Sequence, residues 1–420
     1  MAQQADVLVI GGGVVGLSVA NALLTRGRSV TILERKCPGA GASWGNAGLV
    51  APRYIIPLAA PGVVAQGLWW MLDRESPFRI KPRLDLDLLR WLWSFWSHCS
   101  EDHVERSIPL LRDLNLASRN HYETWAASNE MEDFGFRASG SVVIHRTEKG
   151  RQKNLKQAQR AQEAGLDVSV LERSELDEVL PNGPSEALGG IHYHQDALLN
   201  PVQLVSALEH RVSEKGGSLR PGTAVTDFEQ QDGRIHTVRT PRTEWNANEV
   251  ILAAGAWSAS LAQRVGIDLP IQPAKGYSVT YSAPSKTPDL PYILSETKVA
   301  VTPMNGQVRC AGTLELAGFE GSVDARRTKP ILEEAARYVP HVRPDAPEQE
   351  NVWAGFRPCT PDGLPVIGRV PKIDNLVIAT GHGMMGVSMS PITGQLVAEI
   401  VENESPSIDW SPLSPTRFSE

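Results

Sequence analysis

An α/β fold built around a Rossmann-like nucleotide-binding domain is predicted by three observations on the first 34 residues. The apolar run Asp6–Ile10 has the length of a buried parallel strand and leads into a glycine-rich turn and an apolar helical segment. Three glycines of the turn have G-x-G-x-x-G spacing: Gly11, Gly13 and Gly16. A second strand, Ser29–Leu33, then ends at Glu34, 18 residues after the last of these glycines. This arrangement is typical of a dinucleotide site.

Each position of this turn has an expected role. The first glycine permits the tight turn, the second lets a pyrophosphate approach the backbone, and the third lets the helix pack on the strand. Free N–H groups at the start of the helix, around Val14 and Val15, would meet the phosphates. Glu34 would bind ribose hydroxyls, with Arg35 beside it. The alternative interpretation is a glycine-rich turn without a ligand.

Length and composition limit the classes of protein. A chain of 420 residues exceeds the usual size of one core, so two domains or one domain with a large insertion are expected. The net charge of −7 and the lack of a basic run argue against a nucleic-acid binder. Four widely spaced cysteines without a C-x-x-C motif are expected to be free thiols in a reducing compartment. No secretory signal is visible, which predicts a cytoplasmic protein.

Residues 54–72 carry no charge and imitate a membrane span, but Pro57 and Pro61 interrupt the run. We expect a loop and a short helix over the cofactor. The following segment, 69–96, holds five of the eleven tryptophans: Trp69, Trp70, Trp91, Trp93 and Trp96. This Trp-rich segment has two interpretations, a peripheral membrane patch or helices packed on the substrate domain or on a partner subunit. The composition favours packing.

The later elements alternate between helices and strands. The pattern predicts helices over 102–129, 148–164, 202–215 and 393–402, strands at 141–145, 250–254 and 376–380, a hairpin of 224–228 with 235–240, and an antiparallel sheet over 277–314. The run after residue 250 repeats the pattern of the N-terminus, a buried strand followed by small residues and a helix start. The nucleotide-binding domain is therefore expected to be interleaved with a second domain.

Several blocks together give the chain a resemblance to a known family. These blocks are residues 11–16 with Glu34, 43–48, 59–62, 252–258, 273–278, 353–358, 360–363 and 381–383. They resemble the flavin-dependent D-amino-acid oxidase superfamily, which includes glycine oxidase, sarcosine oxidase and bacterial D-amino-acid dehydrogenase, and the chain is most similar to the dehydrogenases. The Lys-Gly-Tyr-Ser and Arg-Pro blocks are much more specific than the glycine turn.

The resemblance implies a flavoprotein that binds FAD and has two domains, and the lack of a matching cysteine around Cys359 favours noncovalent binding. The FAD-binding domain would comprise 1–80, 195–275 and 350–420, and an α+β substrate domain with a mostly antiparallel sheet would comprise 81–194 and 276–349. The implied reaction is oxidative deamination of a D-amino acid to a 2-oxo acid and ammonia, with hydride transfer from the substrate Cα to flavin N5 and electrons passed to a quinone or another carrier. Alternatives are a dehydrogenase or oxidase of proline, hydroxyproline or sarcosine-type amines, and a flavin subunit of a larger complex.

This chemistry needs no metal and no protein nucleophile, because the protein orients the substrate and tunes the flavin. Arg357 is the first candidate for a clamp on the substrate carboxylate, because guanidinium binds carboxylate bidentately. Tyr277 would donate its hydroxyl to the same carboxylate, and Tyr54 and His382 are further pocket candidates. Met384 stands where glycine oxidase has a second arginine, which favours larger and more apolar substrates. Structural alternatives are a salt bridge for Arg357, sheet packing for Tyr277 and a loop role for His382.

Further expectations concern the flavin itself. Lys275 is a candidate for a position near flavin N5, whereas the spacing around Cys359 does not match the cysteine that carries the covalent flavin of sarcosine oxidase. The remaining positions expected to touch the cofactor by resemblance are Ser43, Asn46, Ala47, Gly48, Val225, Ala254, Gly255, Trp257, Gly381, Gly383, Met384, Met385, Gly386 and Val387.

Overall fold

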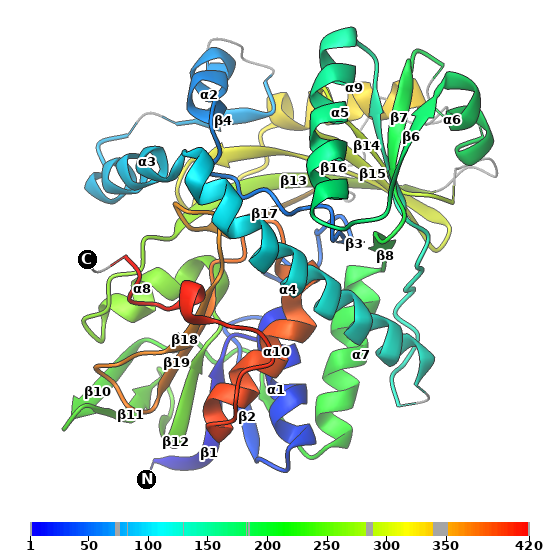
Figure 1. Ribbon diagram of the computed structural model, residues 1–420. Coiled ribbons are helices and arrows are strands. Elements are labelled where there is room, and N and C mark those ends of the chain that lie inside the picture. Colours follow the sequence, from blue (N-terminus) through cyan, green and yellow to red (C-terminus); the bar gives the residue numbers. More distant parts are fainter. Residues whose placement is uncertain are drawn as a thin grey trace.

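A computed structural model of the chain describes residues 2–71, 76–81, 83–128, 130–181, 183, 185–282, 289–338 and 352–418. These residues form two large sheets with helices packed against them. In Figure 1 the first sheet lies in the lower half of the view and the second in the upper half, and the long helix α4 (Glu101–Ala127) runs across both. The mixed α/β fold confirms the predicted class.

The first sheet contains the glycine turn. Its strands are β1 (Gln3–Ile10), β2 (Val30–Leu33), β9 (Ser218–Arg220), β10 (Asp227–Gln231), β11 (Arg234–Arg239), β12 (Glu244–Leu252), β18 (Val366–Arg369) and β19 (Leu376–Thr380). Strands β9, β2, β1, β12 and β19 are parallel neighbours in that order. The predicted strands at 6–10, 29–33, 250–254 and 376–380 are confirmed as β1, β2, β12 and β19. The hairpin β10–β11 turns at Asp232 and Gly233, both left-handed, as its Asp-Gly sequence predicts.

Three helices cover one face of this sheet: α1 (Val14–Thr25), α7 (Pro201–Glu214) and α10 (Gly386–Glu402). The short elements η1 (Gly255–Trp257) and α8 (Ser258–Gln263) follow β12. The sequence placed the start of the last helix near residue 393, whereas α10 begins at Gly386. Pro391 misled that prediction, since proline removes a helical hydrogen bond. Here the hydroxyl of Tyr122 donates to the Val387 carbonyl at 2.6 Å and replaces the missing N–H.

The second sheet is mostly antiparallel. Its path is β17 (Val352–Cys359), β13 (Gln272–Ser282), β16 (Gln307–Leu316), β15 (Val299–Met304), β14 (Tyr292–Leu294), β5 (Ser141–His145), β7 (Gly189–Tyr193) and β6 (Val168–Glu172), with β4 (Phe78–Ile80) also paired to β16. Helices α5 (Glu148–Glu163), α6 (Arg173–Val179) and α9 (Ala325–Tyr338) pack against it. The predicted antiparallel sheet over 277–314 is confirmed, including its turn at Asn305 and Gly306.

The sheets differ in part from the predicted domain division. Strands β4 and β17 pair in the second sheet, although their residues were assigned to the FAD-binding domain. Helix α4 packs against α10, although its residues were assigned to the substrate domain. The predicted boundary at 349 and 350 lies outside the described residues. The two halves are therefore joined by more crossings of the chain than the sequence pattern indicates.

The segment that imitates a membrane span folds as a loop followed by α2 (Val63–Met71), as predicted up to residue 71; Leu72 lies outside the described residues. Within the described chain no helix is long and apolar enough to cross a bilayer. The remaining elements are α3 (Leu86–His98), β3 (Leu49–Val50), β8 (Ala197–Leu198) and η3 (Ser411–Leu413).

Three of the five tryptophans of the Trp-rich segment are exposed in this chain, which agrees with a membrane patch or with packing on a partner subunit but not with packing on the substrate domain. Trp91 is buried, and its indole N–H donates to the Cys359 carbonyl at 3.0 Å. Trp69, Trp93 and Trp96 are 75, 68 and 56% exposed. The reason is geometric: α2 and α3 lie at the edge of the molecule, so each has a face that no other described element covers (Figure 1).

Candidate cofactor and substrate site

A cavity of about 1430 Å³ extends from the glycine turn of the first sheet to the inner face of the second. Small-molecule sites usually measure about 300–1,000 Å³, so this volume suits a dinucleotide together with a small substrate. Its wall includes the ends of β1, β2, β12 and β19, the loop at 40–47, helix α2 and strand β17. The carboxyl ends of parallel strands meet here, where open α/β sheets bind ligands.

The glycine turn has the geometry that a pyrophosphate needs. A Cβ on Gly11 would lie 2.5 Å from the Ala253 carbonyl oxygen, and one on Gly16 would lie 1.9 Å from the Gly11 carbonyl oxygen. Gly13 has no side chain to cap α1, and the Ser43 hydroxyl binds the N–H of Val14, the first residue of the helix. Because this backbone passes so close and the helix end keeps N–H groups directed at the cavity, the residues present fit a bound dinucleotide phosphate.

Glu34 lies at the end of β2, where the sequence placed it. Its carboxylate accepts hydrogen bonds from the Gly12 N–H and the Lys36 N–H, both at 2.8 Å. Arg35 next to it stacks over the indole of Trp257, with the guanidinium carbon 3.5 Å from the ring centroid. These contacts fix the carboxylate and one wall of the cavity before any ligand binds.

The loop at 43–48 is held from both sides. The hydroxyl of Ser43 accepts a hydrogen bond from the Val14 N–H at 3.0 Å, which joins the loop to α1. On the other side the buried Arg309 of β16 donates to the carbonyl oxygens of Trp44 and Asn46, each at 2.7 Å. Burial lowers the pKa of Arg309 to about 10. No sequence pattern points to Arg309, because its partners are backbone atoms far away in the chain.

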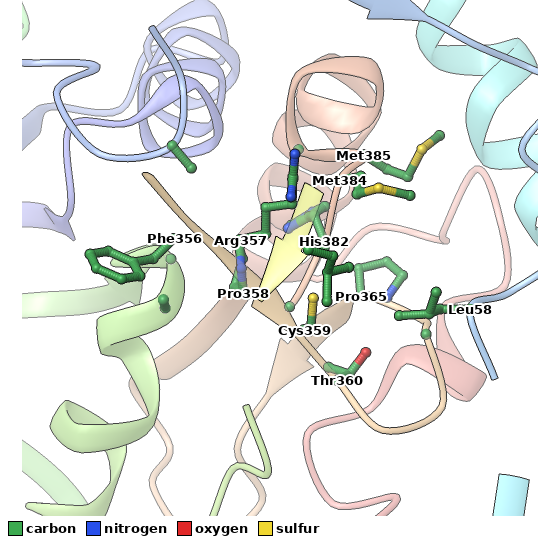
Figure 2. A pocket seen from close by; sticks show the side chains of 18 of the residues that line it. Leu58, Phe356, Arg357, Pro358, Cys359, Thr360, Pro365, His382, Met384 and Met385 are labelled. Carbon is green, nitrogen blue, oxygen red and sulfur yellow. The ribbon is translucent and has the colours of Figure 1, made fainter. Parts of the chain in front are cut away.

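The segment Gly381–Val387 forms the opposite wall. Gly381 and Gly383 are left-handed, with φ of 77° and 52°, which turns the chain from β19 into α10. No side chain caps α10 at Met385, so the N-terminus of this 17-residue helix is open next to the cavity. Figure 2 shows Met384 and Met385 at this turn, with His382 and Arg357 on the adjoining wall.

Arg357 of β17 lies in the wall of the cavity (Figure 2). Its Nη1 donates to the carbonyl oxygen of Thr313 at 2.7 Å, and no carboxylate of the described chain lies within ion-pair distance of it. Burial lowers the pKa of Arg357. A buried guanidinium without a counter-ion is costly unless an anion joins it. The cavity therefore presents one well-placed cation to an anionic ligand.

Tyr277 does not line this cavity. A Cβ on Gly276 would lie 2.2 Å from the Arg357 guanidinium, so Gly276 faces that arginine. Side chains alternate along a strand, which turns Lys275 and Tyr277 to the opposite face of the sheet. There Tyr277 is 1% exposed and donates to Glu315 at 3.3 Å, and the Lys275 ammonium donates to the Ser322 carbonyl. The structure does not bring either residue to Arg357 from the cavity side.

Tyr54 is the tyrosine that lines the cavity near Arg357. Its hydroxyl oxygen accepts a hydrogen bond from Arg53 Nη2 at 2.9 Å, which leaves the hydroxyl proton available to a ligand. Arg53 in turn forms a buried ion pair with Asp196 at 2.9 Å, and Ser141 donates to the same carboxylate at 2.6 Å. This network fixes the position of Tyr54.

His382 lines the cavity but its ring is engaged elsewhere. Its Nε2 lies 2.9 Å from the Thr393 hydroxyl, which itself donates to the Met389 carbonyl. Thr393 therefore accepts, which assigns the proton to Nε2. Burial lowers the pKa of His382 to about 4, so the imidazole is neutral at pH 7. The His382–Thr393 hydrogen bond therefore stabilises the turn before α10.

Most of the predicted site residues line the one cavity. Those that do are Gly11, Gly13, Val14, Val15, Glu34, Arg35, Ser43, Asn46, Ala47, Tyr54, Val225, Ala254, Gly255, Trp257, Arg357, Gly381, His382, Gly383, Met384, Met385, Gly386 and Val387. Gly16 and Gly48 pack behind it against backbone carbonyls. Cavity residues that the sequence did not reveal include Thr313 and Lys298.

Comparisons with known proteins agree with this geometry. Residues 6–400 match the family of FAD dependent oxidoreductases. The chain is 34% identical to a D-amino acid dehydrogenase of Methylobacterium nodulans and 30% identical to one of Granulibacter bethesdensis, in each case over 98% of this chain and 99% of the relative. The crystal structure of glycine oxidase from Geobacillus kaustophilus has a TM-score of 0.80 at 25% identity, covering 99% of both chains.

The cavity and the fold therefore define a nucleotide-dependent oxidoreductase. The chain belongs to the family of FAD dependent oxidoreductases, and FAD is its cofactor. L-proline dehydrogenase from P. horikoshii, at 19% identity and a TM-score of 0.74, shares the fold.

Removing the buried imidazole should weaken the dependence of stability on pH. The unfolded chain takes up this proton near pH 6.5, whereas native His382 does so only near pH 4, so the native state loses stability as pH falls from 6.5 toward 4. At pH 5 this contribution is on the order of 1–2 kcal/mol. We expect His382→Gln to lose less unfolding free energy than the wild type between pH 7 and pH 5, measured by urea denaturation. Exposed His236→Gln is the control. Equal losses of unfolding free energy in the wild type and in His382→Gln would refute the lowered pKa of His382.

Proposed function

We propose that this protein is an FAD-dependent D-amino-acid dehydrogenase, which oxidises its substrate to a 2-oxo acid and ammonia. The observation that carries the proposal is Arg357, a half-buried cation without a described counter-ion in the wall of a cavity that fits a dinucleotide. A carboxylate is the planar anion that a guanidinium fork fits best. The relatives named D-amino acid dehydrogenase match over nearly the whole chain, which supports this substrate class.

The chain's own groups bind and orient the substrate. Bound FAD supplies the two-electron acceptor for oxidation of the amine to an imine, which water hydrolyses. Arg357 holds the carboxylate, and the Tyr54 hydroxyl donates to the same group from the side of Arg53. The Thr313 carbonyl fixes the guanidinium before the substrate arrives, so little ordering remains to be done on binding. Tyr277 does not donate to the substrate carboxylate, because its hydroxyl already donates to Glu315.

Noncovalent binding of FAD is part of the proposal. Cys359 is the one cysteine of the described cavity wall, and burial raises the pKa of its thiol to about 11. A covalent flavin link needs the thiolate as nucleophile. The buried, protonated thiol of Cys359, labelled in Figure 2, supports a cofactor held by contacts alone.

A quinone or another carrier, met at the cytoplasmic face of a membrane, is the proposed electron acceptor. Helices α2 and α3 present exposed apolar side chains: Leu68, Trp69, Met71, Leu86, Leu89, Trp93 and Trp96. Residues of the same two helices, among them Trp70 and Phe95, line the cavity, so its opening adjoins this apolar surface. Tryptophans at such a surface are typical of the water–bilayer interface. The alternative occupant of the surface is a partner subunit.

Anaerobic titration tests the substrate class. Single D-amino acids, their L-forms, D- and L-hydroxyproline and sarcosine are added in turn to the purified yellow protein, and flavin absorbance near 450 nm is followed. We expect bleaching by D-amino acids only, because a relative named D-amino acid dehydrogenase matches 98% of the chain. Bleaching only by prolines or sarcosine would assign a secondary-amine substrate, and acid precipitation that leaves the flavin on the protein would refute noncovalent binding.

Replacement of Arg357 should lower kcat/KM for the substrate and leave the flavin content unchanged. Arg357→Met is expected to lower kcat/KM for the best D-amino acid about 10²–10³-fold, since truncating one partner of a buried charge pair costs about 3–5 kcal/mol. Arg357→Lys should recover part of this, and the exposed Arg264→Met should have no effect. The flavin content of all variants is measured from the visible spectrum. A change of less than fivefold in Arg357→Met would contradict the clamp.

The apolar surface should mediate membrane binding. Sedimentation with vesicles of phosphatidylethanolamine and phosphatidylglycerol is expected to carry down the wild type and to leave the triple variant Trp69→Ser, Trp93→Ser, Trp96→Ser in solution. Leu188→Ser, an exposed apolar residue elsewhere, serves as the control. If the wild type stays in the supernatant and forms an oligomer that the triple variant disrupts, the surface binds a subunit instead.

A further inference from the structure

Lys298 is one of several cations in the cavity wall to which the proposed function gives no role. Lys298 lies at the turn between β14 and β15 and lines the cavity. Its side chain is exposed, but the protein around it removes part of its solvent, and this desolvation, together with Lys153, lowers the pKa of Lys298 to about 8. Among the described residues, no carboxylate forms an ion pair with it.

The charged groups that face Lys298 are bound to other residues, so its ammonium group is available to a ligand. Lys153 of α5 also lines the cavity, and the amide of Gln66 is its hydrogen-bond partner at 3.5 Å. Arg53 is already paired with Asp196. Glu296 is the acidic neighbour, but its Oε1 accepts from the N–H groups of Arg146 and Thr147 at 2.9 and 3.1 Å. Glu296 thus binds the loop before α5. Lys298, Lys153 and Arg53 lie in the same part of the cavity.

Backbone conformation singles out the same place. Five non-glycine residues of the described chain have positive φ, and three of them are Asp or Asn, which tolerate this region at turns. The other two are Lys298, at 59°, and Thr313, at 63°, and both line the cavity. Such a conformation costs about 1–3 kcal/mol and persists where the surrounding structure fixes it, often at ligand sites.

Lys298 and Arg357 flank one strand. The Thr313 carbonyl accepts from Arg357 at 2.7 Å. On the other side, Gly312 lies against β15, where a Cβ on it would be 3.5 Å from the Lys298 carbonyl oxygen. Strands in a sheet are about 4.8 Å apart, so the backbone of Lys298 lies about one strand spacing from Thr313, whose carbonyl holds the Arg357 guanidinium. A ligand held at Arg357 by one carboxylate would bring a second anionic group within reach of the flexible lysine.

We propose that Lys298 is a specificity-determining residue that binds a second carboxylate of the substrate, so that amino dicarboxylic acids such as D-glutamate are preferred over their neutral analogues. This inference rests on the proposed function for its reaction, and on Arg357 for the first carboxylate. It revises the sequence-based expectation of an apolar side chain drawn from Met384, because Met384 lies at the turn before α10, whereas Lys298 lies on the second sheet. A charge-assisted hydrogen bond in such a site contributes about tenfold or more in affinity.

The test compares isosteric substrates in the FAD-loaded enzyme. We expect kcat/KM of the wild type to be about tenfold or more higher for D-glutamate than for D-glutamine, and this ratio to fall toward one in Lys298→Met. Lys298→Arg keeps the charge and should keep the ratio. Lys149→Met, an exposed lysine of α5 outside the cavity wall, is the matched control. In the wild type the ratio should fall as pH rises through 8, because Lys298 then loses its charge.

A binding measurement separates this inference from the proposed function. Calorimetric titration of the holoenzyme with glutarate and with its monoamide should give about tenfold tighter binding of glutarate in the wild type and no difference in Lys298→Met. A selectivity for glutarate that Lys298→Met removes, in a protein that no D-amino acid reduces, would refute the proposed reaction and retain the dicarboxylate site. Equal rates with D-glutamate and D-glutamine, or a ratio that Lys298→Met leaves unchanged, would overturn the role of Lys298.

Discussion

The contact between Arg357 and the Thr313 carbonyl is the constraint on which the substrate end of this cavity depends. It requires three things of the second sheet: Gly276 opposite the guanidinium, a left-handed Thr313 that directs its carbonyl at it, and a shift of register between Lys275 and Tyr277. A side chain at position 276 would occupy the space of the guanidinium. The sheet is thus shaped around one cation, whose burial is costly until an anion binds.

The cofactor end depends on close backbone approach. Gly11 and Gly16 bring β1, β12 and α1 together so tightly that a Cβ at either position would collide with a carbonyl oxygen. Arg309 of the second sheet holds the loop at 43–48, and the same loop is bound to α1 on the first sheet through Ser43. The two sheets are therefore coupled through the walls of the cavity, and a change at either one alters the site of both ligands.

Polar groups behind the cavity wall fix its shape through shared acceptors. Tyr122 satisfies the carbonyl that Pro391 leaves without a donor, so α10 can begin early enough to direct its N-terminus at the cavity. The turn before α10 is fixed by His382 and Thr393, and Tyr54 by Arg53 and Asp196. Preorganisation of this kind lowers the cost of ordering a substrate. Lys298 and Lys153 differ in having few such bonds, as expected of groups that contact a variable part of the ligand.

The sequence by itself determined the first sheet and the nucleotide end of the site. A strand, a glycine turn, a helix and Glu34 are local in the chain, and glycine is required there for steric reasons that any neighbour would impose. The Arg-Pro block located Arg357 in the same way. Tertiary structure decided which face each residue of β13 takes, because the neighbours of Gly276 and Tyr277 come from strands far apart in sequence. It also decided the exposure of Trp69, Trp93 and Trp96 and the presence of Lys298 and Arg357 in the wall of one cavity. Periodicity records which positions share a face, but only packing between distant segments decides what that face meets.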